Sequence, residues 1–136
     1  MQYAPKGYFK GAIFLLIVGL CISKASADDV PKITKEELNV LIDYTDVTIV
    51  DVRTEEDWEK TEFKIKTAVR EDGKNIASWD NKHPKDKTIV LYCAQPHEKT
   101  SASLAGKLIS RGYRKVYVLK GGWGEWSRSQ FPVVKK

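Results

Sequence analysis

The sequence predicts an α/β domain with a central, mostly parallel sheet and helices on both faces. Three short runs rich in β-branched residues, 47–52, 88–92 and 115–119, have the length and composition of strands. Each run is apolar throughout rather than alternating, which is typical of parallel strands buried on both faces. Helical patterns precede the first run and separate the second from the third, as in α/β folds. A composition of 42% hydrophobic and 30% charged residues is that of an ordinary globular protein.

The first elements of the domain are a short helix and a buried strand. Thr34 and Glu37 have the spacing of a capping box, which predicts that a helix begins here. The apolar stripe of this helix is Leu38, Leu41 and Ile42. The strand over residues 47–52 follows.

The next segment contains a second short helix and a stretch without a clear pattern. Thr54 is the expected cap of the helix, which holds Trp58. We expect residues 64–80 to be irregular. Their predicted inward positions are Ile65, Ala68, Val69 and Ile76.

The second half of the domain predicts strand, loop, helix and strand. The strand 88–92 ends at Cys93, and a helix is expected from about Thr100 to Arg111. Gly112 stands where the end of a helix favours a left-handed residue. The strand 115–119 follows. The predicted buried face of the helix is Ala102, Ala105, Leu108 and Ile109.

Residues 1–27 have the three parts of a secretory signal peptide. Lys6 and Lys10 form a basic start, residues 11–23 are apolar, and Ala25-Ser26-Ala27 is a cleavage site of the A-x-A type. The apolar run is shorter than the ~18 residues of a typical membrane span. We therefore expect cleavage, export to the periplasm and a single domain over residues 28–136.

Two alternatives for this leader remain open. An uncleaved leader would anchor the protein in the membrane, and lipidation of Cys21 would do so through its thiol. Lipidation is disfavoured because that processing normally requires a small residue before the cysteine, and this chain has Leu20.

Charge and cysteine content exclude several function classes. The chain has 23 basic and 18 acidic residues; without the three leader lysines, 20 remain against 18, a net charge of +2. So small and scattered an excess argues against nucleic-acid binding. Two cysteines and two histidines are too few for a cysteine-rich zinc site, so no metal or cofactor is expected. After cleavage, Cys93 is the single cysteine in an oxidising compartment.

The junction between the second strand and the following helix is the candidate site. Ligands of parallel sheets bind at the carboxyl ends of strands, and Cys93 stands at such an end. Because Pro96 has no N–H, five loop amides remain as donors, and the helix near Thr100 adds its positive end. Such a nest would bind an anion and favour a thiolate nucleophile. The predicted binding residues are Ala94, Gln95, His97, Glu98, Lys99 and Thr100. The alternative is that Cys93 is only a small core residue.

Four segments resemble the rhodanese-like domain family in the same order along the chain. They are Asp51-Val52-Arg53 followed by Asp57-Trp58; Tyr92-Cys93 with its loop and helix; Leu119-Lys120-Gly121-Gly122-Trp123 with Trp126; and Phe131-Pro132-Val133. The resemblance covers residues 31–134 and implies the rhodanese-like α/β fold.

The resemblance also implies sulfur transfer through Cys93. The thiolate would take a sulfane sulfur from a small anionic donor such as thiosulfate and pass it to an acceptor. That acceptor would be cyanide or a thiol, including a thiol on a protein. Asp51 and Arg53 would support the site structurally, as an ion pair or network beneath it.

The loop departs from the commonest pattern of the family. It is about two residues longer and contains neither Gly nor Arg. Lys99 is the nearest substitute for the arginine, or else a solvated lysine. His97 would assist proton transfer or simply lie exposed, and Glu98 would repel dianionic substrates.

Two other functions compete with sulfurtransferase activity. A cysteine-based phosphatase or arsenate reductase would use a similar anion cradle, but that chemistry needs an arginine to hold phosphoryl oxygens. A non-enzymatic persulfide carrier or redox-sensing module would keep the cysteine and is hard to separate from an enzyme by sequence.

Overall fold

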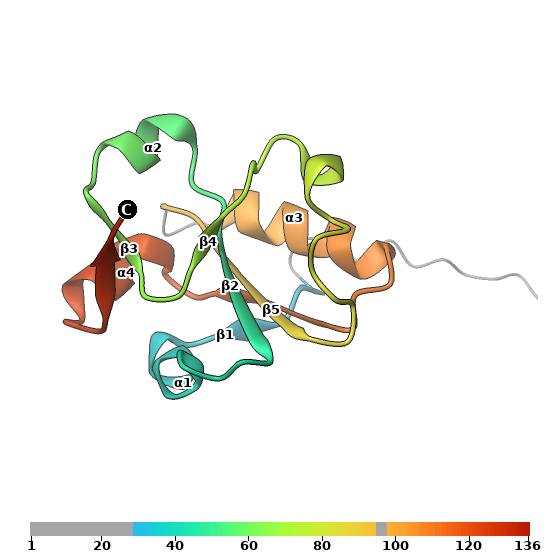
Figure 1. Ribbon diagram of the computed structural model, residues 1–136, viewed down its shortest axis with the longest axis horizontal. Coiled ribbons are helices and arrows are strands. Elements are labelled where there is room, and N and C mark those ends of the chain that lie inside the picture. Colours follow the sequence, from blue (N-terminus) through green and yellow to red (C-terminus); the bar gives the residue numbers. More distant parts are fainter. Residues whose placement is uncertain (1–28, 95–97) are drawn as a thin grey trace, which may run out of the picture.

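A five-stranded parallel sheet forms the centre of the molecule (Figure 1). The computed structural model describes residues 29–94 and 98–136. Every pairing in this sheet is parallel. In spatial order its strands are β1 (Lys32–Ile33), β6 (Lys115–Leu119), β5 (Thr88–Tyr92), β2 (Val47–Asp51) and β4 (Val69–Arg70). The predicted α/β architecture is confirmed, and so are the three predicted strands.

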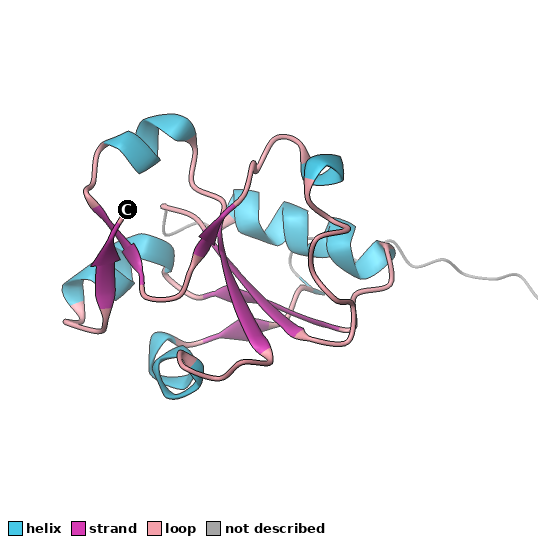
Figure 2. Ribbon diagram, in the orientation of Figure 1, coloured by secondary structure: helices cyan, strands magenta, loops and turns pink. Residues whose placement is uncertain are grey.

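Helices cover both faces of the sheet (Figure 2). On one face, α3 (Lys99–Ser110) and the 3₁₀ turn η2 (Ile76–Ser78) pack on the sheet. On the other face lie α1 (Lys35–Leu41) and α4 (Gly122–Arg128). The short helix α2 (Glu55–Glu59) follows β2. Cys93 belongs to the core cluster on the α3 face.

Two helix boundaries form as their local sequence predicts. The Thr34 N–H donates to the Glu37 carboxylate at 2.8 Å, and the Glu37 N–H donates to the Thr34 hydroxyl at 3.2 Å. This capping box starts α1. Gly112 has φ +94° just after α3, in the left-handed region that favours glycine. Its N–H donates to the Ile109 carbonyl at 3.0 Å, which closes the helix.

The segment 64–80 is more regular than predicted. It contains part of β3 (Phe63–Ile65), all of β4, and η2. β3 pairs antiparallel with β7 (Val133–Lys135) in a small second sheet. The expectation that Val69 points inward is wrong, because it lies on edge strand β4 and is 39% exposed.

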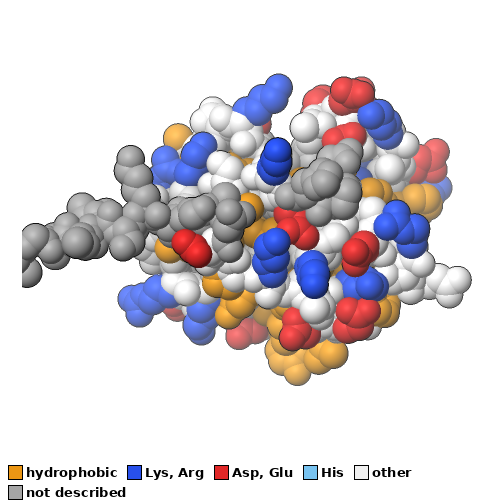
Figure 3. Space-filling view, turned by 180° about the vertical axis from the view of Figure 1, so that it is seen from behind, with side chains coloured by type: hydrophobic (Ala, Val, Ile, Leu, Met, Phe, Trp, Pro, Cys, Tyr) orange, Lys and Arg blue, Asp and Glu red, His pale blue; other side chains and the backbone are white. Residues whose placement is uncertain are grey.

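The described surface carries charges of both signs. On the face shown in Figure 3, lysine and arginine side chains are interspersed with aspartate and glutamate. Within residues 29–94 and 98–136, no helix combines the length and apolar character that crossing a bilayer requires.

Candidate active site

Cys93 lies at the carboxyl end of β5, in the middle of the parallel sheet. It is a free cysteine and only 6% exposed. The Val52 N–H donates to the Tyr92 carbonyl at 3.0 Å, so the end of β2 lies directly beside the cysteine. The sulfur is therefore held in a fixed place at the sheet edge where parallel folds bind ligands.

Ser101, in the first turn of α3, contacts the sulfur. Its Oγ lies 3.4 Å from the Cys93 Sγ, and the serine is fully buried. The same hydroxyl donates to the Glu98 carbonyl at 3.0 Å, which leaves the thiol to donate to Ser101. If the thiol ionises, the hydroxyl can rotate and donate to the sulfur instead. The contact also places the sulfur beside the positive end of a 12-residue helix.

Cys93 and Glu98, on either side of the loop, both form hydrogen bonds with the start of α4 and the residue that caps it. At the start of the loop, the Trp123 N–H donates to the Cys93 carbonyl at 2.9 Å. At its end, the Gly121 N–H donates to the Glu98 carboxylate at 2.8 Å. Gly121 has φ +78°, so this turn favours glycine at that position. These two contacts connect Cys93 and Glu98 to the same part of the chain.

Glu98 is a buried carboxylate with a second partner. Lys32, from β1, donates to it at 2.7 Å. Burial alone would raise the pKa of Glu98, but Lys32 and the Gly121 amide outweigh burial and hold this pKa below its ordinary value. The carboxylate is thus ionised and occupied by contacts within the protein. Glu98 itself has a left-handed backbone with φ +51°.

The predicted binding residues fall into three groups. Ala94 is half-buried beside Cys93, and the carboxylate of Glu98 is bound to Lys32 and Gly121. Lys99 and Thr100 are exposed at the start of α3. Gln95 and His97 lie outside the described residues.

A buried polar network lies under this edge of the sheet, on the face opposite α3. Arg53 forms an ion pair with Asp51 at 2.6 Å, and both side chains are inaccessible to solvent. The guanidinium also donates to the Thr61 hydroxyl at 2.9 Å and to the Phe63 carbonyl at 3.1 Å. These partners leave the guanidinium well compensated by groups of the protein itself, as a buried charge requires. The structural role expected for Asp51 and Arg53 stays a prediction.

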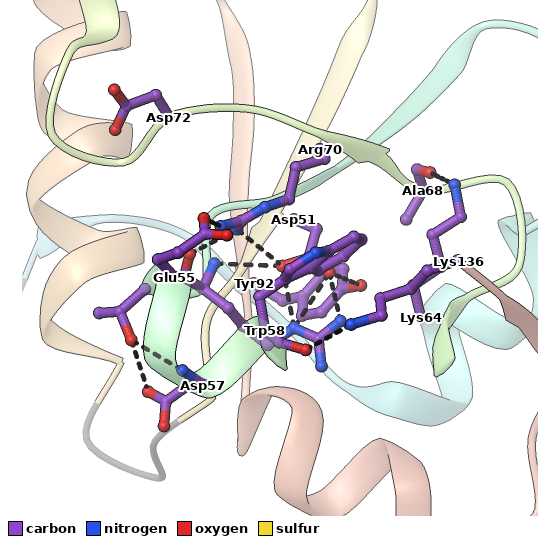
Figure 4. Close-up of polar contacts among 12 residues, drawn as sticks. Asp51, Glu55, Asp57, Trp58, Lys64, Ala68, Arg70, Asp72, Tyr92 and Lys136 are labelled. Atoms are coloured by element: carbon purple, nitrogen blue, oxygen red, sulfur yellow. Dashed lines mark hydrogen bonds and ion pairs between the residues drawn. The ribbon is translucent and has the colours of Figure 1, made fainter. Parts of the chain in front are cut away.

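Aromatic rings complete the network. The Tyr92 hydroxyl donates to Asp51 at 2.5 Å; burial, reinforced by this carboxylate, raises the pKa of Tyr92, so the hydroxyl stays a donor. The Arg53 guanidinium lies 4.5 Å from the Trp123 ring centre and 5.0 Å from that of Trp58. Figure 4 shows Trp58 with Arg70 and Lys136 beside its ring.

A cleft of about 940 Å³ opens beside the first turn of α3. Val52 and Thr100 line it, whereas Cys93 does not, so the cleft and the sulfur are neighbours rather than one cavity. Within the described parts of the chain, no group of His, Cys, Asp and Glu side chains comes together as a metal site.

Sequence reasoning placed Cys93 at the end of a buried strand, where the structure has it, but missed Ser101 and the partners of Glu98. The position of Ser101 in the first turn of the predicted helix, just after the loop that follows Cys93, could have pointed to it. Lys32 and Gly121 come from distant parts of the chain, so nothing near Glu98 in the sequence pointed to them.

The fold and the site together define an α/β protein with a free cysteine at the end of a central parallel strand and its sulfur against the first turn of a helix. The family model of the rhodanese-like domain matches residues 34–129, which is more than half of the chain. The chain belongs to the rhodanese-like domain family, which is of sulfurtransferase type.

Named relatives agree with this membership. The thiosulfate sulfurtransferase GlpE of Coxiella burnetii is 31% identical over 86 residues, covering 63% of this chain and 77% of the relative. A sulfurtransferase of Allochromatium vinosum is 32% identical over 94 residues, covering 69% of this chain and 84% of the relative.

Solved structures share the fold. A rhodanese-related protein from Thermoplasma volcanium has a TM-score of 0.66 at 22% identity, covering 78% of this chain and 99% of that one. At this identity the likeness concerns the fold alone.

Proposed function

We propose that this protein transfers a sulfane sulfur from a small anionic donor such as thiosulfate to a thiophilic acceptor, through a persulfide on Cys93. The observation that carries the proposal is the position of the Cys93 sulfur, at a strand end and 3.4 Å from a hydroxyl in the first turn of α3. Membership of a family with sulfurtransferase relatives supports the reaction class.

The reaction has two steps. The Cys93 thiolate attacks the outer sulfur of thiosulfate; a sulfur–sulfur bond forms on the enzyme, and the bond to sulfite breaks with its electron pair. The acceptor thiolate or cyanide then attacks the outer sulfur of the persulfide, and the Cys93 thiolate leaves. The thiolate is regenerated after each cycle, as nucleophilic catalysis requires.

The negative charge of the thiolate and persulfide must be stabilised at a nearly buried position, because Cys93 is only 6% exposed. The first turn of α3 offers N–H groups that have no partner within the helix, and the positive end of the helix dipole. The Ser101 hydroxyl supplies a donor that can switch from the Glu98 carbonyl to the sulfur. Such fixed donors stabilise charge without rearrangement during the reaction.

Turnover with thiosulfate and cyanide tests the proposal. Cys93→Ser should abolish sulfur transfer while leaving the circular dichroism spectrum unchanged, because the substitution alters little volume. Ser101→Ala should retain the persulfide route but slow it. A Cys93→Ser protein that still transfers sulfur would overturn the proposal; a wild type that forms the persulfide yet turns nothing over would be a carrier instead.

We also propose that the domain acts outside the cytoplasm after removal of residues 1–27. The order of basic start, apolar run and A-x-A site supports this. The acceptor would then be a thiol of that compartment.

A further inference from the structure

The cleft beside the site has one wall made by a single face of α3. Lys99, Ser103 and Lys107 line it at intervals of four residues, so they form a row along the helix. The segment that follows β4 makes the facing wall, with Gly73, Lys74 and Ser78 among its residues. The cleft is therefore a trough that runs along α3, away from Cys93.

The cations of the trough exceed its acids. Arg70 pairs with Glu55 at 3.1 Å, and Lys82 pairs with Glu71 at 3.3 Å, so these four charges balance. Arg53, which also lines the trough, is paired with buried Asp51 at 2.6 Å, so its charge is balanced as well. The other lining cations, Lys74, Lys99 and Lys107, form no salt bridge with any described residue.

The remaining acid of the trough reduces this excess only in part. Asp72 accepts a hydrogen bond from the Lys74 backbone N–H at 2.8 Å, and it offsets one of the three lysine charges. The trough thus carries a net positive charge that complements an acidic ligand.

The dimensions of the trough exceed those of the sulfur donor. Lys107 lies eight positions after Lys99 along the helix, which is a rise of about 12 Å at 1.5 Å per residue. Thiosulfate cannot contact both lysines, whereas an extended peptide reaches across with about four residues. The volume of about 940 Å³ also fits a ligand of peptide size.

The trough begins next to the reactive cysteine. Thr100 lines it and directly precedes Ser101, whose hydroxyl contacts the Cys93 sulfur. Val52 also lines the trough, and its N–H donates a hydrogen bond to the carbonyl of Tyr92, the residue before Cys93. A chain lying in the trough would thus have one end at the site.

We propose that this trough binds an extended acidic segment of a partner protein whose thiol accepts sulfur from Cys93. The inference rests on the proposed function and names the class of its acceptor. In the transfer step the partner thiolate attacks the outer sulfur of the persulfide, a new sulfur–sulfur bond forms on the partner, and the Cys93 thiolate leaves with the electron pair of the broken bond.

The experiment compares three synthetic acceptor peptides. The first is a cysteine followed by a run of about six glutamates, long enough to span the trough. The second carries glutamines in place of the glutamates, and the third carries a single glutamate. Sulfur transfer from thiosulfate to each is measured at low and high salt, and transfer to cyanide is measured in parallel.

The variant is the double substitution Lys74→Glu with Lys107→Glu, at two exposed positions. The matched control is Lys115→Glu, because Lys115 is exposed at the start of β6 and does not line the trough. We expect the long acidic peptide to exceed the other two in kcat/KM by about tenfold at low salt and to lose this advantage at high salt. The double variant should remove the advantage, whereas cyanide rates and the control stay within about twofold of wild type.

Each contrary result has a distinct meaning. Equal rates for the three peptides, or an advantage that survives the double variant, would overturn the inference. An advantage shared by the single-glutamate peptide would assign the trough to small anions and overturn it too. If the wild-type protein transfers no sulfur from thiosulfate even to cyanide, the proposed function is wrong. Binding of the long and neutral peptides to Cys93→Ser, followed by fluorescence anisotropy, then still tests the trough.

Discussion

Removing the Lys32 ammonium should destabilise the fold through the buried Glu98 carboxylate. Lys32→Met keeps most of the aliphatic stem and deletes the group that donates to Glu98 at 2.7 Å. The carboxylate is 8% exposed and would retain only the Gly121 amide, at 2.8 Å. An anion left so poorly compensated is costly.

The exposure of the two partners sets the magnitude. Breaking a fully buried ion pair costs about 3–5 kcal/mol, whereas an exposed pair contributes about 0–1 kcal/mol. The Lys32 side chain is 46% exposed, so water screens one side of this pair. We therefore expect the free energy of unfolding to fall by about 1–3 kcal/mol at neutral pH, the cost of leaving a buried acceptor without its partner.

The loss should also depend on pH in a defined direction. The unfolded chain has the ordinary carboxyl pKa of 4.5, and the folded state holds the pKa of Glu98 below that value. The carboxylate contacts therefore stabilise the fold fully above the ordinary pKa, and this contribution disappears as the pH falls through the lowered one. The difference between wild type and Lys32→Met should shrink accordingly in acid.

Urea denaturation at neutral and acidic pH measures both effects. Lys35→Met is the matched control, because Lys35 meets Glu36 and Glu125 at 3.3 and 3.4 Å and water reaches both carboxylates, whose side chains are 64% and 44% exposed. This variant should lower the free energy of unfolding much less. Equal stability of the two variants at neutral pH, or a loss in Lys32→Met that grows in acid, would contradict this role of Lys32.

Three further predictions concern binding, stability and processing. Lys99→Ala should raise KM for thiosulfate more than it lowers kcat, since a uniform electrostatic contact is lost; steady-state kinetics in which kcat collapses at constant KM would contradict this. Arg53→Met should lower the free energy of unfolding by about 3–5 kcal/mol in urea titrations, because it removes the cation 2.6 Å from buried Asp51 and leaves only Arg70, at 3.9 Å; a loss below about 1 kcal/mol would show that the pair is dispensable. N-terminal sequencing of the protein from its native compartment should begin at Asp28, whereas a start at Met1 with recovery in membranes would establish an uncleaved anchor.

Local signals made much of the fold predictable. The capping box of Thr34 and Glu37, the apolar strands and the left-handed Gly112 all depend on neighbours within a few residues, and all are present. The small sheet of β3 and β7 was not predictable, because its strands are short and distant in sequence. The helix α4 was missed because it begins among glycines, which are poor helix formers; burial of Trp126 accompanies its formation.

The site was predictable only where chemistry and local order coincide. Cys93 follows an apolar strand and precedes a helix, and the sequence alone predicted that position; its role as the nucleophile stays a prediction. The sequence around Glu98 could not show that its carboxylate meets Lys32 and Gly121, since tertiary packing alone brings β1 and the turn after β6 to the loop. The sequence of α3 likewise could not show that its lysine-bearing face lines a trough, because the same pattern is typical of an ordinary solvated helix face.

The most direct measurement of the central claim is the mass of the protein after incubation with thiosulfate in the absence of an acceptor. We predict a gain of one sulfur atom on wild type, localised to the peptide that contains Cys93 and removed by cyanide or by a thiol. Cys93→Ser should gain nothing under the same conditions. A wild-type protein whose mass stays unchanged, or whose added sulfur lies on another peptide, would contradict the account.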